Sequence, residues 1–215
     1  MITLAIPKGR IFHDVLPLLE AAGVELFESP DLSRKLVIEP KKPNIRLLIV
    51  RTSDVPTYVR YGAADMGVVG SDILFETATD GFYQPVDLNT GVCRLSLAAP
   101  VGVDYLSLMK RGVKLRVATK YPKQALEYFA LKGIQVDIIK LYGSMELSPI
   151  VGLSDVIVDL VSTGQTLRAN GLVEIEVIKD ITSRLIVNKA SFKMKNNILG
   201  KFITTLSSVR KVSLK

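Results

Sequence analysis

The sequence predicts an α/β protein, and two observations support that prediction. Short apolar runs such as ITLAIP and MGVVG alternate with segments of helical periodicity, which is typical of strands joined by helical crossovers and of largely parallel sheets. Near Pro100 the alternation restarts as though a second unit had begun, without a low-complexity linker. We therefore expect two small α/β lobes that share a cleft, a first lobe of residues 1–90 with 176–215 and a second of residues 91–175.

The individual elements follow from the spacing of apolar residues. In the first lobe, strands are expected at ITLAIP, RKLVIEP, IRLLIVR and MGVVG. A helix over RIFHDVLPLLEAAG ends at Gly23, and SDVPTYVRYGA predicts a short helix capped by Ser53 or Asp54. In the second lobe, a helix from Pro122 to about Lys132 is expected among strands at CRLSLAAP, LRVAT, VDIIKLY and DVIVDLV. VEIEVI and RLIVN lead into a terminal amphipathic helix, which we expect to return to the first lobe.

Composition excludes several functional classes. The chain has 215 residues, of which 48% are hydrophobic, yet no apolar run approaches the roughly 18 residues of a membrane span. The first residues lack the order of an export signal, so we expect a cytoplasmic protein without a membrane partner. The net charge is +7, but the lysines of the terminal segment alternate with an apolar stripe. This pattern favours a solvated helix face over a nucleic-acid surface.

Cysteine and histidine are scarce. Cys93 is the only cysteine and His13 the only histidine, so the chain has no internal disulfide and no cysteine-based zinc site. Serine-histidine or cysteine-histidine catalysis would rest on one imidazole in a predicted helix, far in sequence from Cys93. The sequence therefore disfavours nucleophilic catalysis of this kind.

The stretch VIVDLVSTGQTLRANG, residues 156–171, predicts a phosphate-binding loop. Gly164 permits close backbone approach, and the N–H groups and hydroxyls around it can donate to phosphate oxygens. A helix beginning near Gln165 would point its positive end at the same anion. Asp159, at the end of a buried strand, can accept hydrogen bonds from both ribose hydroxyls. The loop predicted to bind a 5-phosphoribosyl group thus comprises Asp159, Ser162, Thr163, Gly164, Gln165 and Thr166; the alternative is an ordinary capped helix start.

An acid at a strand end followed by a hydroxyl-glycine-hydroxyl loop resembles the phosphoribosyl-diphosphate loop of phosphoribosyltransferases. The segment VIVDLVSTGQTLRANGL closely resembles that of the ATP phosphoribosyltransferase family, which begins histidine biosynthesis. Five further segments resemble blocks of that family in the same order: AIPKGRI, RTSDVPTYV, GAADMGVVGSDIL, CRLSLAAP and YGSMELSP. The length resembles that of the short form, which implies a homodimer within a hetero-oligomer and a separate regulatory subunit similar to histidyl-tRNA synthetase.

The sequence departs from the type I phosphoribosyltransferase signature, which has two adjacent acids, because Leu160 follows Asp159. The resemblance implies instead a two-lobed fold like that of type II periplasmic solute-binding proteins. It also implies the reaction, in which adenine N1 of ATP bonds to C1 of phosphoribosyl diphosphate and pyrophosphate leaves. Such a reaction needs alignment and fixed charge rather than a protein nucleophile.

Two polyanionic substrates require cations. Lys8 and Arg10 lie between the first strand and helix, and the resemblance places them in the substrate site; exposed loop charges are the alternative. Arg51 follows IRLLIV and either reaches pyrophosphate or pairs with Asp54. We expect catalytic roles for Arg51 and Arg10. Arg34 is a further candidate, for which a solvated strand-edge charge is the alternative.

Two acids complete the predicted nucleotide and pyrophosphate site. Asp72 either caps a helix or, as the resemblance implies, contacts the nucleotide. Glu146, in the loop with Gly143 and Ser144, either contacts a substrate or is an acid of a first helical turn. Pyrophosphate leaving groups usually travel with Mg²⁺, which takes few protein ligands, so Mg²⁺ is the expected cofactor and its ligands are not assigned.

Two other functions compete with this one. A solute-binding or sensor protein of the same two-lobed fold would capture an anion without turnover. A type I phosphoribosyltransferase would use a free base and would have a single sheet.

Overall fold

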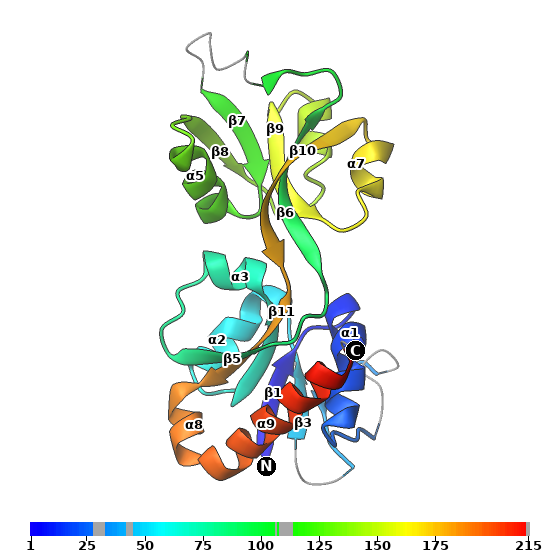
Figure 1. The fold of residues 1–215 in the computed structure, drawn as a ribbon, viewed down its shortest axis with the longest axis vertical. Coiled ribbons are helices and arrows are strands. Elements are labelled where there is room, and N and C mark those ends of the chain that lie inside the picture. Colours follow the sequence, from blue (N-terminus) through cyan, green and yellow to red (C-terminus); the bar gives the residue numbers. More distant parts are fainter. Residues whose placement is uncertain (28–32, 42–44, 106, 108–113, 214–215) are drawn as a thin grey trace. The chain divides into compact units, whose positions relative to one another are not determined.

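The computed structural model describes residues 1–27, 33–41, 45–105, 107 and 114–213. The chain forms two compact units, Met1–Gly91 with Thr182–Lys215, and Val92–Ile181. Each unit has its own sheet, so the structure confirms the α/β class (Figure 1). The second unit extends to Ile181 instead of ending at residue 175, because β10 (Leu172–Ile181) pairs with the same neighbouring strand from end to end.

The first unit is built on a six-stranded sheet in the order β2-β3-β1-β4-β11-β5. Strands β1, β3 and β4 are parallel, whereas β2, β11 and β5 each pair antiparallel with a neighbour. The strands are β1 (Ile2–Ile6), β2 (Val37–Ile38), β3 (Ile45–Ile49), β4 (Met66–Gly70), β5 (Phe82–Asp87) and β11 (Ser183–Asn188). The helices are α1 (Arg10–Ala21), η2 (Thr52–Asp54), α2 (Val55–Arg60), α3 (Ser71–Glu76), α8 (Lys189–Met194) and α9 (Asn196–Ser213).

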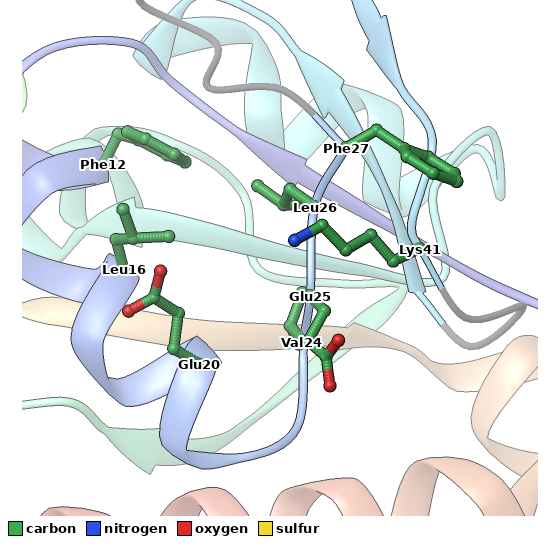
Figure 2. A pocket seen from close by; sticks show the side chains of 8 residues that line it. All are labelled: Phe12, Leu16, Glu20, Val24, Glu25, Leu26, Phe27 and Lys41. Atoms are coloured by element: carbon green, nitrogen blue, oxygen red, sulfur yellow. The ribbon is translucent and has the colours of Figure 1, made fainter.

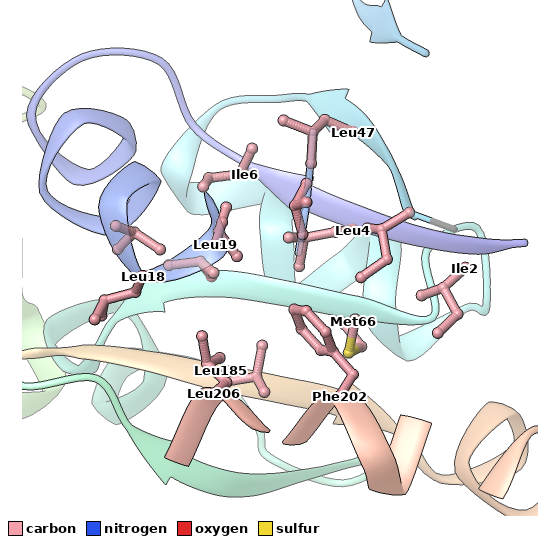
Figure 3. Packing of buried hydrophobic residues seen from close by; sticks show 14 of the residues in the cluster. Ile2, Leu4, Ile6, Leu18, Leu19, Leu47, Met66, Leu185, Phe202 and Leu206 are labelled. Carbon is pink, nitrogen blue, oxygen red and sulfur yellow. The ribbon is translucent and has the colours of Figure 1, made fainter. Parts of the chain in front are cut away.

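The core of the first unit includes the terminal helix. Leu199, Phe202 and Leu206 of α9 belong to the same buried cluster as Leu4 of β1 and Leu19 of α1 (Figure 3). The amphipathic stripe predicted for this segment therefore packs on the sheet and on α1, whereas Lys201 of α9 is exposed. None of the described helices is both long enough and apolar enough to cross a membrane.

The second unit has a five-stranded mixed sheet in the order β10-β6-β9-β7-β8. Strands β7, β8 and β9 are parallel, and β6 is antiparallel to both of its neighbours. The elements are β6 (Cys93–Pro100), β7 (Leu115–Thr119), α5 (Pro122–Leu131), β8 (Val136–Lys140), α6 (Leu147–Ile150), β9 (Val156–Val161), α7 (Gln165–Ala169) and β10. The sheet is thus less parallel than expected, since β6 and β10 are antiparallel additions to a parallel β7-β8-β9 core.

A buried ion pair attaches the terminal segment to the first unit. Asp65 is 5% exposed; Lys195 Nζ lies 2.9 Å from each of its carboxylate oxygens, and the Thr3 N–H donates to Oδ2 at 2.9 Å. Burial alone would raise the pKa of Asp65, but the hydrogen bonds from Lys195, Ser191 and Thr3 outweigh it and lower the pKa. The ionised carboxylate is therefore the form that stabilises the fold.

We expect Asp65→Asn to lower the free energy of unfolding at neutral pH by about 2 kcal/mol, because Lys195 loses its charged partner. A folded-state pKa below the ordinary value of 3.8 stabilises the protein above that value, and this stability is lost as pH falls through the folded-state pKa. Urea unfolding between about pH 7 and pH 3 should show the difference between parent and variant shrinking in acid. Asp80→Asn, at a surface ion pair with Arg60, is the control and should cost little. If the difference in unfolding free energy between the parent and Asp65→Asn did not change with pH, this account would be contradicted.

Candidate substrate-binding site

The predicted phosphoribosyl loop follows β9 in the second unit. Asp159 is half-buried, lies opposite Ser96 of β6, and accepts a hydrogen bond from the Leu160 N–H to Oδ1 at 2.8 Å. The side chains of Ser162, Thr163, Gln165 and Thr166 are exposed. An oriented carboxylate and several polar side chains thus lie within one turn of the chain.

Gly164 determines the shape of this loop. It has φ 72° and ψ 7°, the left-handed conformation, and it is the N-cap of α7. The Gln165 N–H lies 3.4 Å from Thr163 Oγ1, and Leu167 packs in the same buried cluster as Val161. Helix α7 has only five residues, so a helix dipole adds less than the sequence suggested, and the loop's own N–H groups and hydroxyls are its means of binding an anion.

Gly164→Val is expected to weaken binding of phosphoribosyl diphosphate about tenfold or more, because a β-branched residue is strained at positive φ. A Cβ at this position would lie 3.0 Å from Arg168 Nη1. Gly171→Val is the matched control: Gly171 has φ 69°, but no heavy atom lies within 4 Å of its Cβ position. Calorimetric titration of both variants should show a loss of affinity at Gly164 only. Equal affinities in the two variants would contradict a binding role for this turn.

The loop that carries Glu146 lies at the same edge of the second sheet. Strands β8 and β9 both run parallel to β7, so the segments that follow them leave from the same side. Met145 is buried in the cluster that contains Val161 and Leu167, which brings Glu146 close to the phosphoribosyl loop. Glu146 is the N-cap residue of α6, yet its half-buried side chain makes no capping hydrogen bond. Glu146 thus lies at the start of α6 without capping it.

Four predicted cations gather at one edge of the first sheet, which we call the basic edge: Lys8, Arg10, Arg34 and Arg51. Lys8 and Arg10 follow β1, and Arg51 follows β3, whose end pairs with that of β1 through Ile6 and Ile49. Lys8 Nζ donates to the Ser33 carbonyl at 2.8 Å, which places the neighbouring Arg34 at the same edge.

All four side chains of the basic edge are exposed. Arg51 and Asp54 form no ion pair; Asp54 Oδ1 accepts instead from Ser53 Oγ at 3.0 Å. The alternative in which Arg51 simply pairs with that acid is therefore wrong.

Asp72 differs from the expectation. It is 7% exposed and is the second residue of α3, whereas Gly70 occupies the N-cap position. Its carboxylate folds back over Gly70 so closely that a Cβ on Gly70 would lie 2.1 Å from Asp72 Oδ1. Asp72 is thus not the cap of α3, and it lies at the carboxyl end of β4, beside the basic edge.

In the structure, two arginines that the sequence did not single out donate hydrogen bonds to the backbone of the phosphoribosyl loop. Arg94 Nη1 donates to the Ser162 carbonyl at 3.0 Å, and Arg168 Nη2 donates to the Thr163 carbonyl at 3.1 Å. Glu174 of β10 binds the Arg94 guanidinium. No motif in the sequence indicated this network, and the register shift between Glu174 and Glu176 in β10 could not be read from the alternation of VEIEVI.

A cavity of about 350 Å³ in the first unit is separate from these groups (Figure 2). None of the predicted site residues lines it; its walls are Phe12, Leu16, Glu20, Val24, Glu25, Leu26, Phe27 and Lys41.

The fold defines a class, the α/β proteins with two units that each have their own sheet, and here a glycine turn follows the carboxyl end of β9. The periplasmic aliphatic sulphonate binding protein SsuA from Escherichia coli shares this fold with a TM-score of 0.63 at 10% identity, covering 99% of this chain and 73% of that one. The periplasmic VFT2 domain of Bordetella pertussis BvgS has a TM-score of 0.58 at 13% identity, covering 98% of this chain and 92% of its own. At such identities the likeness shows the fold alone, and it confirms the expected solute-binding architecture.

Within that class, this chain belongs to the ATP phosphoribosyltransferase family. The family model matches residues 51–208. The ATP phosphoribosyltransferase of Albidiferax ferrireducens is 58% identical over 208 residues, 97% of this chain and 98% of that protein. The enzyme of Janthinobacterium sp. is 57% identical over 212 residues, 99% of this chain and 96% of that protein. The ATP phosphoribosyl transferase (HisG:HisZ) complex from Thermotoga maritima contains a chain with a TM-score of 0.81 and 36% identity, and the match covers 100% of both chains.

Proposed function

We propose that this protein is the catalytic subunit of an ATP phosphoribosyltransferase. It joins adenine N1 of ATP to C1 of 5-phosphoribosyl 1-diphosphate and releases pyrophosphate, the first step of histidine biosynthesis. The observation that carries the proposal is the left-handed Gly164 turn beside Asp159, in a chain 58% identical to named ATP phosphoribosyltransferases over nearly its whole length. The N1 lone pair forms the new bond as the C1–oxygen bond to pyrophosphate breaks, so no protein nucleophile is required.

We assign the sugar to the phosphoribosyl loop. Asp159 accepts from the ribose hydroxyls, and its orientation supports this role because the Leu160 N–H holds one of its oxygens. The hydroxyls and N–H groups of Ser162, Thr163, Gly164, Gln165 and Thr166 bind the 5-phosphate. Glu146 contacts substrate from the neighbouring loop.

We assign the nucleotide and the leaving pyrophosphate to the basic edge. Arg51 and Arg10 stabilise the charge that develops on pyrophosphate, while Lys8 and Arg34 add to the binding of phosphate groups. Asp72, at the carboxyl end of β4 beside the basic edge, contacts the nucleotide.

Mg²⁺ is the proposed cofactor. In the described part of the chain, no three His, Cys, Asp or Glu side chains converge in a way that would hold a metal ion. This residue set fits an ion that arrives on the diphosphate, keeps several waters and takes one or two carboxylates such as Asp159 or Glu146. When bound, Mg²⁺ would neutralise charge on the departing pyrophosphate.

The reaction is tested by incubating the full chain with ATP, phosphoribosyl diphosphate and Mg²⁺, measuring pyrophosphate, and identifying the nucleotide product by mass. We expect equal amounts of pyrophosphate and of phosphoribosyl-ATP. Release of pyrophosphate with adenine or orotate in place of ATP would indicate a type I enzyme, whose expected single sheet the two-sheet structure lacks. Ligand-dependent closure without turnover would indicate a solute-binding or sensor protein.

A regulatory partner belongs to the proposal. The Thermotoga maritima relative was solved as a HisG:HisZ complex, which supports assembly of this chain with a HisZ-like subunit. We propose in addition that this chain forms a homodimer within that hetero-oligomer. We place the assembly in the cytoplasm, because both substrates are phosphorylated metabolites made there. The assay above, run with and without the HisZ-like subunit, should give higher turnover in its presence.

A further inference from the structure

Arg94 links the phosphoribosyl loop to the edge of the second sheet. Its Nε and Nη2 donate to Glu174 at 2.5 Å each, and its Nη1 donates to the Ser162 carbonyl at 3.0 Å. Ser96 Oγ also donates to Glu174, at 2.7 Å. A bidentate pair fixes the plane of a guanidinium, so the remaining nitrogen of Arg94 can point in only one direction, toward Ser162.

The ion pair behind this contact persists at neutral pH. Hydrogen bonds from Arg94 outweigh desolvation and, together with Ser96, hold the pKa of Glu174 below its ordinary value. Glu174 in turn raises the pKa of Arg94. Both groups are therefore charged at neutral pH.

Arg168 acts on the next peptide group. Its Nη2 donates to the Thr163 carbonyl at 3.1 Å, and its Nη1 would lie 3.0 Å from a Cβ on Gly164. The carbonyls of two consecutive residues in the loop are thus each held by a guanidinium.

The orientation of these carbonyls determines where the loop's donors point. In a trans peptide the C=O and the following N–H point in opposite directions. The Thr163 N–H therefore points away from Arg94, and the Gly164 N–H points away from Arg168. Successive N–H groups that end in a left-handed residue form the concave donor set that binds anions.

We propose that Arg94 and Arg168 are positioning residues that hold the peptide groups of the phosphoribosyl loop so that the N–H groups of Thr163 and Gly164 face the 5-phosphate. This rests on the proposed function, which supplies the phosphate. The arginines do not touch the substrate. Each prevents a peptide flip that would turn a carbonyl oxygen toward the anion.

The structure offers a matched control in the same sheet, at the amino ends of β7 and β9. Arg116 Nη2 and Nε bind Asp155 at 2.7 and 3.3 Å, and its Nη1 donates to the Gly152 carbonyl at 2.8 Å. The chemistry is the same as at Arg94, a carboxylate plus one backbone carbonyl, but that carbonyl is not in the phosphoribosyl loop. Arg116→Met removes an equivalent network away from the site.

The test compares Arg94→Met, Arg168→Met and Arg116→Met by calorimetric binding of phosphoribosyl diphosphate, by Tm and by steady-state kinetics. We expect Arg94→Met to weaken binding about tenfold and Arg168→Met about threefold. Losses of this size correspond to one misplaced N–H donor to the phosphate in each variant. The KM for phosphoribosyl diphosphate should rise while the KM for ATP stays unchanged. Arg116→Met should lower Tm as Arg94→Met does and bind phosphoribosyl diphosphate as the parent does.

Three outcomes would count against the proposal. Parent-like affinity in Arg94→Met would overturn it, as would an equal loss in Arg116→Met, because the effect would then be one of sheet stability. If Arg94→Met does not fold, the proposal is tested on Arg168→Met, because the Arg168 side chain is exposed and its removal should not prevent folding. Parent-like affinity of Arg168→Met for phosphoribosyl diphosphate would then overturn the proposal. A parent chain that binds no phosphoribosyl diphosphate would overturn the proposed function itself.

Discussion

Asp159→Ala is expected to weaken binding of phosphoribosyl diphosphate about 100-fold, because two hydrogen bonds from the ribose hydroxyls to a charged acceptor are lost together. The carboxylate is half-buried and already oriented by the Leu160 N–H, so it accepts these bonds with little loss of side-chain entropy. ATP binding should be nearly unchanged, since the proposal assigns the nucleotide to other residues. Calorimetric titration with each substrate separately measures both effects.

Asp155→Ala is the matched control for this variant. Asp155 precedes the same strand and pairs with Arg116, which contributes to the lowering of its pKa. Its loss should reduce stability without reducing affinity for phosphoribosyl diphosphate. If Asp159→Ala and the parent bound phosphoribosyl diphosphate with equal affinity, Asp159 would not be the residue that binds the ribose hydroxyls.

Arg51→Met is expected to lower kcat by about 100-fold, the loss typical of removing one preorganised group that stabilises transition-state charge. The Arg51 side chain is exposed and makes no ion pair with Asp54, so its removal should change the free energy of unfolding by no more than about 0.5 kcal/mol. A large kinetic effect with an unchanged Tm would therefore reflect catalysis rather than folding. Arg51→Lys should recover only part of the rate, because an ammonium group cannot form the two parallel bonds of a guanidinium.

Lys201→Met is the control that distinguishes a specific role of Arg51 from an effect of the protein's net charge. Lys201 is an exposed cation on α9, outside every part of the proposed site, and its removal lowers the net charge by the same amount. Its kcat should equal that of the parent. An equal decrease in both variants, or none in Arg51→Met, would show that Arg51 does not stabilise the leaving group.

Local features of the chain could be predicted from the sequence. The acid, the hydroxyls and the glycine of the phosphoribosyl loop are neighbours along the chain, and in the structure Gly164 has the positive φ that glycine permits. Lys8 and Arg10 were predicted beside a strand end, and the structure places them there. Such features follow from apolar periodicity and turn chemistry within about ten residues.

Prediction from sequence was less complete for residues whose surroundings are formed by segments far away in the chain. Asp72 was expected to cap a helix or to contact the nucleotide, and the structure shows that its carboxylate packs over Gly70 without capping α3. Arg34 was a candidate for the substrate site with a solvated charge as the alternative, and the contact of Lys8 with Ser33 places it at the basic edge. Arg94 was read only as part of a strand, although its partners Ser162 and Glu174 lie 68 and 80 residues away.

The sequence by itself determined the α/β class, the site of the phosphoribosyl loop and the resemblance to one family, because each depends on residues close together in the chain. Only the tertiary structure decided which cations share an edge, which carboxylates are buried, and which arginines hold the loop. Those outcomes depend on sheet order and strand register, which are set by packing between segments far apart in sequence. No local pattern encodes that Lys195 will find Asp65, or that Arg94 will find the loop.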